Sequence, residues 1–598
     1  MKTKKRISLL LVMMMLVSAF AGCGKTEVKE ESKQTEETKV EESKQTEESK
    51  VEEKKEPTVI TLASTVAMPT SPIPWYDTEI WQYIQELANV KIEYIEYDEE
   101  LFNLMLTSGD VPDIVFSNVS AKLDNIIESG LALDMKPYLE EYAPNMASDT
   151  YAQRNEIIST YRGGENNALY FIAPRMGVEA PTGGADGSRG YNIRWDYYKE
   201  MGAPEITDDE AYIEILEKMA AEHPETEAGE KVYATGLYDS LNTWYYRATF
   251  VEPTMSNPWA VSGTQYLATF EDSELFNGYT DTEKGAFWVD MAFYNKLWNK
   301  GLLDPDSFTQ TSDTYTEKIK AGRYLATTYN RSNDLYNQAK TTDPDTIIGI
   351  NRIPSSTAQV AFGGKKMLLG DFPTNYMFAS AKTENVEAVM SFFNVIHDLD
   401  VLRIFYSGFE GRHWNYVDGV PTFTDEMQKS ITDYDEMAQE LGREYCFKMM
   451  PVLGSFLAED GYPVYLNEME SNRAASLNNV AKDVADYYGV DYPSQLMWQK
   501  VEAGEMISLE NDCVQLIASC MPAMPTDIAR IKEKINDILY RAIPDLVKAK
   551  DQAEFDAVQA RVLKDLEDAG EPDAWEWVST EYNKAKDVVM PIFETCPW

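Results

Sequence analysis

The segment that begins near residue 58 alternates short strands with helices, and this order constrains the fold more than any other feature. Val90 to Tyr97 alternates between apolar and polar side chains, which predicts a strand. Thr58 to Ser64 and Ile114 to Phe116 are short β-rich runs, and Thr78 to Leu87 carries apolar residues at helical spacing. The order strand, helix, strand, helix, strand, helix with short connections predicts an α/β fold with a parallel sheet between helices. Ligands of such sheets bind where the strands end, here in the loops after the first and third strands.

The N-terminus predicts secretion. Lys2 to Arg6 is positively charged, and Ile7 to Phe20 is apolar but short for a membrane span. Phe20-Ala21-Gly22-Cys23 resembles the bacterial lipobox, although Phe20 stands where Leu is usual. The resemblance implies a signal peptide over residues 1–22 and a diacylglycerol on Cys23, which anchors the chain at the outer face of the cell membrane. The alternative is an ordinary secreted protein.

Residues 23–57 predict a tether. Glu30 to Val40 reads EESKQTEETKV, and Glu41 to Val51 repeats it as EESKQTEESKV. A run of Glu, Lys, Ser and Thr cannot bury enough apolar surface to offset its conformational entropy. We therefore expect a disordered spacer between the anchor and the folded body.

Composition excludes some functions and leaves others open. The formal net charge of −46 disfavours nucleic acid, which requires a basic surface. The chain has three histidines and no sequence pattern typical of hydrolases, zinc sites or nucleotide-binding loops. We therefore expect that the protein is not an enzyme and that it binds no cofactor and no metal ion. Among 100 acidic residues, however, a hydrolytic carboxylate pair stays possible. The remaining cysteines fit no metal motif: Cys446, Cys513, Cys520 and Cys596. A Cys513–Cys520 disulfide and free thiols are both open.

Seven segments occur in an order that resembles family 1 extracellular solute-binding proteins, in the branch that binds oligosaccharides. They are SGDVPDIVFSN (Ser108 to Asn118), LALDMKPYLEEYAPN (Leu131 to Asn145), YNIRWDYYKEMGAPEITDDEAYIEIL (Tyr191 to Leu216), FYNKLWNKGLLDPDSFTQ (Phe293 to Gln310), AGRYLATTYN (Ala321 to Asn330), AKTENVEAVMSFFNVIHD (Ala381 to Asp398) and YSGFEGRHWNYVDGVP (Tyr406 to Pro421).

This resemblance implies a two-lobe, periplasmic-binding-protein-like fold of type II, in which each lobe is a sheet flanked by helices. The lobes are discontinuous, with lobe 1 at 58–172 plus 365–430 and lobe 2 at 176–360 plus 430–598, ending in a helical C-terminal region. Some relatives carry a calcium loop, but the corresponding 220–236 lacks the ligand spacing that calcium requires.

The expected ligand contacts combine aromatic faces, which pack on sugar rings, with polar groups that bind hydroxyls. They lie in loops at expected strand ends or beside the crossings between lobes, and for several of them a core or turn role is an equal alternative. The set is Trp75, Asn118, Arg194, Trp195, Trp244, Tyr329, Glu410 and Trp414. Trp75, Trp195, Trp414 and Tyr329 are expected to be partly exposed without ligand. The sequence leaves open whether Trp244 lines a cleft or packs in the core, and whether Arg194 contacts the ligand or pairs with Asp196.

The resemblance implies capture of a small solute, most simply an oligosaccharide, and its delivery to the permease subunits of an ABC transporter by a monomeric lipoprotein. A surface enzyme that degrades polysaccharides is the first alternative. A peptide-binding transport protein is the second.

Overall fold

The structure is a computed structural model. It describes residues 56–595 apart from 67–72, 97, 179–189, 246, 249–260, 262–263, 270–271, 329–332, 334, 338–339, 341–346, 354–359, 362–365, 434–435, 443–446, 476 and 509–512. The predicted signal peptide, the predicted lipidation site Cys23 and the predicted tether lie outside these residues.

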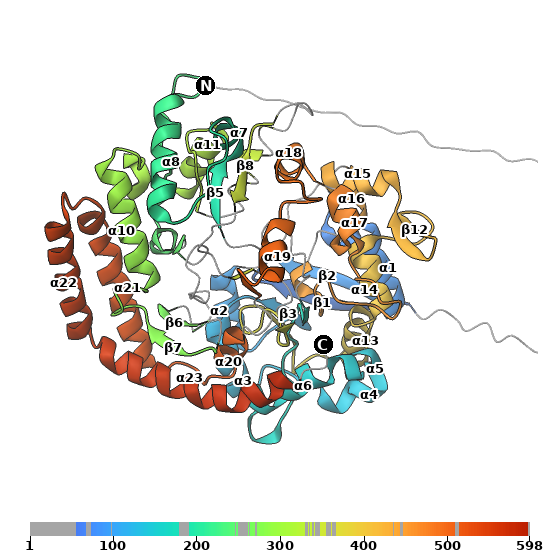
Figure 1. Cartoon of the computed structure of the whole chain (residues 1–598). Coiled ribbons are helices and arrows are strands. Elements are labelled where there is room, and N and C mark those ends of the chain that lie inside the picture. Colours follow the sequence, from blue (N-terminus) through green and yellow to red (C-terminus); the bar gives the residue numbers. More distant parts are fainter. Residues whose placement is uncertain are drawn as a thin grey trace, which may run out of the picture. The chain divides into compact units, whose positions relative to one another are not determined.

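A four-stranded sheet forms near the start of the body, as the sequence predicts (Figure 1). Its order is β11-β3-β1-β2, with β1 (Thr58–Ser64) parallel to β2 (Val90–Glu96) and to β3 (Ile114–Ser117). The helices α1 (Glu79–Ala88), α2 (Glu99–Ser108) and α3 (Leu123–Glu128) follow the three strands in turn. The predicted alternation of strand and helix is therefore confirmed.

Asp113 holds the sheet together just before β3. Its Oδ2 accepts hydrogen bonds from the backbone N and the Oγ1 of Thr61 in β1, both at 2.8 Å, and its Oδ1 accepts one from Thr383 Oγ1 at 2.6 Å. Gly109, at φ +70°, ends α2 and turns the chain toward this strand. The Asp113 side chain thus joins β1 to the loop that contains Thr383, which lies 270 residues after Asp113.

The first sheet is completed from distant parts of the sequence. Strand β11 (Tyr376–Ala379) pairs antiparallel with β3, and α13 (Val386–Ile396) packs on α1 and β1. The helices α14 (Leu399–Ser407) and α16 (Glu436–Leu441) also contact α1, and the short helix η8 (Leu466–Glu468) contacts α14. Packing thus extends the group around this sheet beyond residue 430, the predicted end of lobe 1.

A second sheet is built around β5 (Tyr191–Arg194), which pairs antiparallel with β8 (Ile350–Ile353). At the end of β5, the backbone N of Arg194 donates to Leu325 O at 2.7 Å. The segment around Leu325 runs parallel to 233–235, which in turn lies parallel to 302–303. Four helices lie between β5 and β8 in the sequence: α7 (Trp195–Glu200), α8 (Asp209–Glu222), α10 (Ala286–Asn299) and α11 (Ser312–Lys320).

The remaining described elements are α4 (Leu139–Tyr142), α5 (Pro144–Ala147), α6 (Asp149–Arg162), β4 (Gly177–Val178), β6 (Tyr266–Ala268), β7 (Leu275–Asn277), β9 (Val360–Ala361), β10 (Lys366–Met367), β12 (Trp414–Val417), β13 (Val420–Phe423), α15 (Asp425–Asp433), α17 (Glu470–Ala475), α18 (Asn479–Tyr488), α19 (Gln495–Glu502), β14 (Ile507–Ser508), α20 (Val514–Ser519) and several short 3₁₀ helices.

Two segments connect the elements around the first sheet with those around the second, and a third segment, which lies between α16 and η8, is hydrogen-bonded to them. We call them crossing 1 (172–176), crossing 2 (366–372) and crossing 3 (449–453). Arg175 N donates to Met450 O at 2.8 Å, Leu453 N donates to Met176 O at 2.9 Å, and Asp371 N donates to Pro174 O at 3.1 Å. Gly370 at φ +51° lies so close to Pro174 that a Cβ there would approach its carbonyl oxygen to 1.9 Å.

Three long helices end the chain: α21 (Thr526–Val547), α22 (Gln552–Ala569) and α23 (Glu571–Glu594). Helix α21 packs on α22, α23 and α10 (Figure 1). The predicted helical C-terminal region is therefore confirmed. Within the described part of the chain, every helix is too short or too polar to cross a bilayer.

Candidate functional site

The carboxyl ends of β1 and β3 carry a group of small polar side chains. Thr65 follows β1, and its hydroxyl donates to Asn118 Oδ1 at 2.9 Å and contacts Ser117 Oγ at 3.2 Å. Asn118 N donates back to Thr65 Oγ1 at 3.0 Å, so the two loops are fixed to each other. These are the two loops in which the sequence predicts ligand contacts.

Asn118 presents a hydrogen-bond donor from this edge. The residue is exposed, its Oδ1 is occupied by Thr65, and its Nδ2 donates to no partner among the described residues. The residues directly after these strands are uncharged: Thr65 and Val66 after β1, and Asn118, Val119 and Ser120 after β3. An amide donor among hydroxyls, without a formal charge, suits the hydroxyl groups of a neutral ligand.

The second sheet has a corresponding edge where the parallel segments 233–235 and 324–326 end. Tyr238 and Thr327 follow these segments, and Tyr238 is half-buried. Beneath this edge lies a network of buried amides, in which Asn192 Nδ2 donates to Thr327 O at 3.1 Å and Asn333 Nδ2 donates to Asn192 Oδ1 at 3.0 Å. Satisfied buried amides of this kind fix the backbone at the edge. The predicted contact Tyr329 lies two residues further on, outside the described residues.

Trp75 is buried rather than partly exposed. It begins a 3₁₀ helix, and its ring packs edge-to-face on Trp81 at 4.6 Å and on Tyr94 at 5.3 Å between centroids. Its Nε1 is buried and has no hydrogen-bond partner among the residues that the structure describes. Four per cent of the residue is accessible, so only a rearrangement of this loop would bring its ring face to a ligand.

Arg194 and Trp195 are buried where β5 leads into α7. Arg194 Nε and Nη2 donate to the two carboxylate oxygens of Asp196 at 2.9 and 2.5 Å, which is the pairing that the sequence leaves as the alternative. Burial lowers the pKa of Arg194, but the hydrogen bonds and charge of Asp196, together with the nearby Tyr336 and Tyr197, outweigh it and hold the pKa above its ordinary value. Trp195 Nε1 donates to Asp483 Oδ2 in α18 at 2.6 Å, so its polar edge is already occupied.

Trp244 is also a core side chain. Its ring packs on Tyr294 at 5.6 Å and on Phe308 at 5.1 Å between centroids, and 2% of the residue is accessible. Sequence alone left the Trp244 cluster open between a cleft and a core, and in this structure its ring lies in the core.

Glu410 and Trp414 lie on either side of a tight turn. Trp414 is buried, and its Nε1 donates to Gly408 O at 2.9 Å. Glu410 is exposed, and Arg412 pairs with Glu79 at 2.5 Å instead of with Glu410. His413 is buried, and within the described ranges its Nε2 has no hydrogen-bond partner.

The expected partial exposure is therefore wrong for Trp75, Trp195 and Trp414, because each of these side chains is buried. Asn118 and Glu410 are the predicted contacts that the structure leaves exposed. The ligand contacts themselves stay predictions.

A pocket of about 450 Å³ lies beside α19, and sequence reasoning did not anticipate it. Its walls include Tyr198, Ile206, Ile353 and Tyr488, and its polar rim includes Gln499 and Lys500. The volume is in the range of small-molecule sites. These residues come from regions some 300 positions apart, which is why no local pattern signals the pocket.

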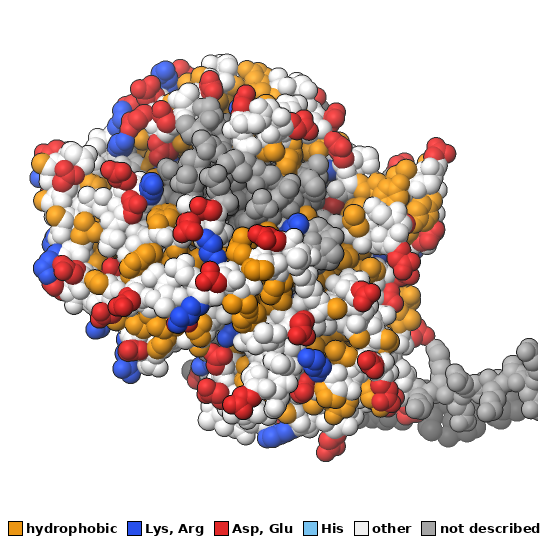
Figure 2. All heavy atoms as spheres, turned by 60° about the horizontal axis from the view of Figure 1, so that its bottom comes forward, with side chains coloured by type: hydrophobic (Ala, Val, Ile, Leu, Met, Phe, Trp, Pro, Cys, Tyr) orange, Lys and Arg blue, Asp and Glu red, His pale blue; other side chains and the backbone are white. Residues whose placement is uncertain are grey.

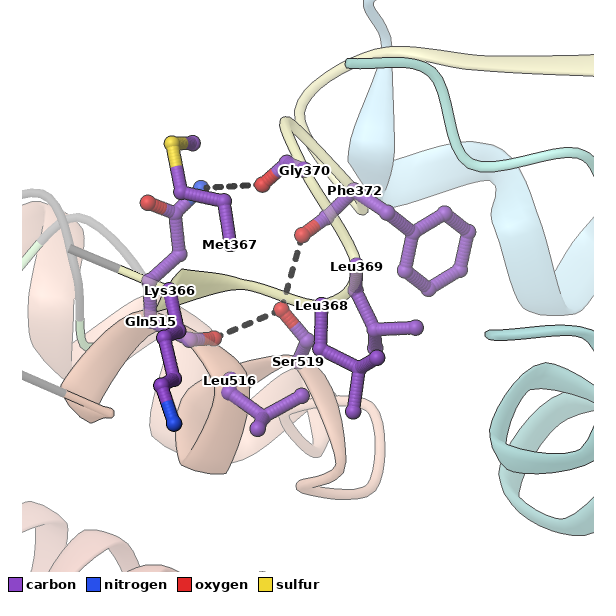
Figure 3. Close-up of a pocket in the computed structure, with 9 residues that line it drawn as sticks. All are labelled: Lys366, Met367, Leu368, Leu369, Gly370, Phe372, Gln515, Leu516 and Ser519. Carbon is purple, nitrogen blue, oxygen red and sulfur yellow. Dashed lines mark hydrogen bonds between the residues drawn. The ribbon is translucent and has the colours of Figure 1, made fainter. Parts of the chain in front are cut away.

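A much smaller pocket lies where α20 meets crossing 2 (Figure 3). Ser519 Oγ contacts Phe372 O at 2.8 Å and Gln515 O at 2.6 Å, and Gln515 Nε2 donates to Gly370 O at 3.4 Å. Its volume of about 10 Å³ holds at most one water. This contact therefore fixes crossing 2 to α20 rather than binding a solute.

The structure describes two of the four remaining cysteines. Cys513 and Cys520 are buried free thiols, while Cys446 and Cys596 lie outside the described residues. Burial raises the pKa of Cys520 to about 12, so its thiol is unreactive at neutral pH. Across the described ranges, no three acidic, His or Cys side chains come close enough to hold a metal ion.

Comparison of the sequence with known proteins gives one relative. Lipoprotein LipO of Bacillus subtilis (strain 168) is 22% identical over 361 residues, which are 56% of this chain and 64% of LipO. The match thus spans less than two thirds of that relative. No protein-family model matches the sequence.

Solved structures resemble the chain over nearly its whole length. The S. pneumoniae ABC-transporter substrate-binding protein FusA, in complex with kestose, matches with a TM-score of 0.55 and 13% identity over 89% of this chain and all of FusA. The alginate-binding protein AlgQ2 matches with a TM-score of 0.54 and 14% identity over 88% of this chain and 98% of AlgQ2. An extracellular solute-binding protein of Bifidobacterium longum subsp. infantis matches with a TM-score of 0.50 and 13% identity over 88% of this chain and 98% of its own. The chain therefore has the fold of ABC-transporter substrate-binding proteins, as predicted.

Proposed function

We propose, from this substrate-binding-protein fold, that the chain is the solute receptor of an ABC importer, that it does not act as an enzyme and that it binds an oligosaccharide. The match to such proteins over almost nine tenths of the chain carries the proposal. The solute would lie in a cleft between two lobes, one around the first sheet and one around the second. A lipoprotein relative supports attachment to the outer face of the membrane through Cys23. The lobe boundaries stay predictions, and the packing of α16 and η8 favours assigning them to the first lobe.

The chemistry of the sheet edges favours a neutral sugar over a charged one. The residues directly after β1 and β3 offer hydroxyls and the Asn118 amide but no cation, and the first cation after β3 is Lys122, at the end of the short helix η2 (Ser120–Lys122). A uronate oligosaccharide, such as a fragment of alginate, would need a positive group to balance its carboxylates. We therefore infer that neutral oligosaccharides bind more tightly at this edge than uronate oligosaccharides of equal length.

The test is calorimetric titration of the soluble body, residues 56–598, with kestose-type and other neutral oligosaccharides, alginate oligomers and short peptides. We expect binding of at least one neutral oligosaccharide without release of a shorter sugar. Binding of peptides alone, or turnover of a polysaccharide, would contradict the proposal.

Two variants locate the solute. Asn118→Ala is expected to weaken binding about tenfold, because an exposed amide donor to a sugar hydroxyl is lost. Gln499→Ala at the rim of the pocket beside α19 is the matched control and should leave the affinity unchanged. A loss of affinity in Gln499→Ala, with unchanged affinity in Asn118→Ala, would show instead that the solute binds in that pocket.

A further inference from the structure

The hairpin of β12 and β13 exposes apolar side chains that belong to no core. The accessible fractions are 45% for Tyr416, 54% for Val417 and 37% for Val420. In the loop beside them, Leu457 is 58% accessible. Apolar side chains gather on the part of the surface that projects at the right of Figure 2, where β12 lies in Figure 1. We call Tyr416, Val417 and Val420 the hairpin tip.

The hairpin tip is held rigidly. Val417 pairs with Val420 across a two-residue turn, in which Asp418 and Gly419 have φ values of +52° and +81°. Positive φ at both central residues is the turn whose twist matches the strands, and Asp-Gly is a preferred sequence for it. The exposed valines are thus presented in one fixed conformation.

Asp460 fastens the hairpin to the body. Arg403 in α14 forks onto it, with Nη1 to Oδ2 at 2.7 Å and Nη2 to Oδ1 at 2.8 Å. Tyr416 donates its hydroxyl to Asp460 Oδ2 at 2.6 Å, and the Arg403 and Tyr416 hydrogen bonds hold the pKa of Asp460 well below its usual range. A bidentate arginine pair on a buried guanidinium restricts motion more than an exposed ion pair does. Truncating the ring of Tyr416 would therefore also loosen the hairpin, whereas the two valines take no part in this anchor.

We propose that the hairpin tip is a docking surface for the membrane-embedded permease of the importer, and that it inserts into an apolar hollow rimmed by basic residues. The proposal rests on the function proposed above. Rigid, exposed apolar side chains are typical of interaction sites, since ordering them on binding costs little entropy. The carboxylates of Asp418 and Glu459 are exposed beside the apolar side chains, so the complementary rim is basic.

Charge also decides between possible occupants. A second copy of this chain would place acidic rims against each other, in a protein whose formal net charge is −46. A bilayer surface rich in anionic lipid would repel the same rim. A protein partner with basic residues around an apolar hollow is the occupant that satisfies both parts of the surface.

The test uses the full-length, lipid-anchored chain in its own cells. A photoreactive amino acid is placed at position 417, and separately at position 588, because Val588 in α23 is similarly exposed at 49% but lies on another element. After irradiation, mass spectrometry identifies the adducts. We expect position 417 to cross-link to an integral membrane subunit of an ABC importer and position 588 not to do so. Adducts of position 417 to a second copy, to lipid or to no protein would overturn the proposal.

A double variant supplies a functional readout. Val417→Ser with Val420→Ser should lower the affinity of the solute-loaded protein for membranes that contain the permease about tenfold, the scale of losing an interface hot spot. Solute affinity measured by calorimetry should be unchanged, and Val588→Ser should affect neither measurement. Unchanged solute uptake by the double variant would overturn docking at the hairpin. Absence of any solute binding by the wild-type chain would instead overturn the proposed function, so the two failures are distinguishable.

Discussion

Arg154 offers a sharp test of how the body is held together beside crossing 1. This guanidinium on α6 is fully buried, and no carboxylate of the described residues forms an ion pair with it. It donates to Ala173 O in crossing 1 at 3.1 Å, to Asn155 Oδ1 at 3.0 Å and to His397 Nε2 at 3.0 Å. Burial lowers the pKa of Arg154 to about 10, which leaves it charged at neutral pH.

Arg154→Met should destabilise the body by about 3 kcal/mol. The Ala173 carbonyl and the His397 ring cannot turn away, so two buried acceptors lose their donor at about 1–3 kcal/mol each. Removing a buried charge that has no counter-ion is itself stabilising, so it offsets part of this loss of stability. The measurement is equilibrium unfolding in urea at pH 7.5 on residues 56–598. Arg541→Met is the control, because Arg541 is exposed on α21 and should change stability by less than about 0.5 kcal/mol.

The pH dependence gives this reasoning a second, independent check. Nδ1 of His397 donates to Phe393 O at 2.6 Å, so Nε2 accepts from Arg154 and the ring is neutral. Burial, and then the charge of Arg154, lower the pKa of His397 well below its usual 6.5. The unfolded chain therefore binds a proton more readily, so this contribution to stability is complete above pH 6.5 and falls as the pH drops below it.

The slope of stability against pH below 6.5 should be shallower in His397→Gln, by up to about 1.4 kcal/mol per pH unit. Arg154→Met should lie between His397→Gln and the wild type, since burial of the imidazole remains. An Arg154→Met protein as stable as the control, with the wild-type slope, would refute the whole account.

Three further outcomes are expected. Trp195→Phe should lower the free energy of unfolding by about 1–3 kcal/mol and leave solute affinity intact, because the lost indole N–H leaves Asp483 without that donor; a loss of affinity with unchanged unfolding would show instead that Trp195 contacts the solute. Asp460→Asn should raise amide exchange in β12 and β13 only, and unchanged exchange there would show that Asp460 does not fasten the hairpin. Cys23→Ala should release the chain into the medium or leave an unprocessed precursor, and intact mass showing a mature N-terminus elsewhere with no lipid on Cys23 would contradict the anchor.

The first sheet was predictable from sequence because its signals are local. The alternation in β2, the helical spacing in α1 and the break at Gly109 each lie within about ten residues, and the structure has all three. The C-terminal helices α21 and α22 were predictable for the same reason, since amphipathic spacing over long runs has few alternatives.

The exposure of the tryptophans was not predictable, because partners distant in sequence decide it. Trp195 is fixed by Asp483, which lies 288 positions later, and Trp244 packs on Tyr294 and Phe308. Trp75 lies in a Pro-rich loop, so its sequence context suggests an exposed ring, but Trp81 and Tyr94 pack against it. Asn118 was easier to place, because a residue directly after a parallel strand lies at the edge of the sheet whatever packs elsewhere.

The crossings show why the limits of the predicted lobes are harder to locate than the lobes' sheets. A limit inferred from sequence assumes that the chain leaves one group of elements where it enters the other. Here crossing 3 lies between α16, which contacts α1, and η8, which contacts α14, so the chain is still among the elements around the first sheet after position 430. Backbone hydrogen bonds join crossing 1 to crossing 3 and crossing 2 to crossing 1, while Arg154 and Ser519 attach crossings 1 and 2 to α6 and α20. If the predicted lobes close around a solute, the chain would have to turn about crossings 1 and 2, and Arg154 is bonded to the first of these.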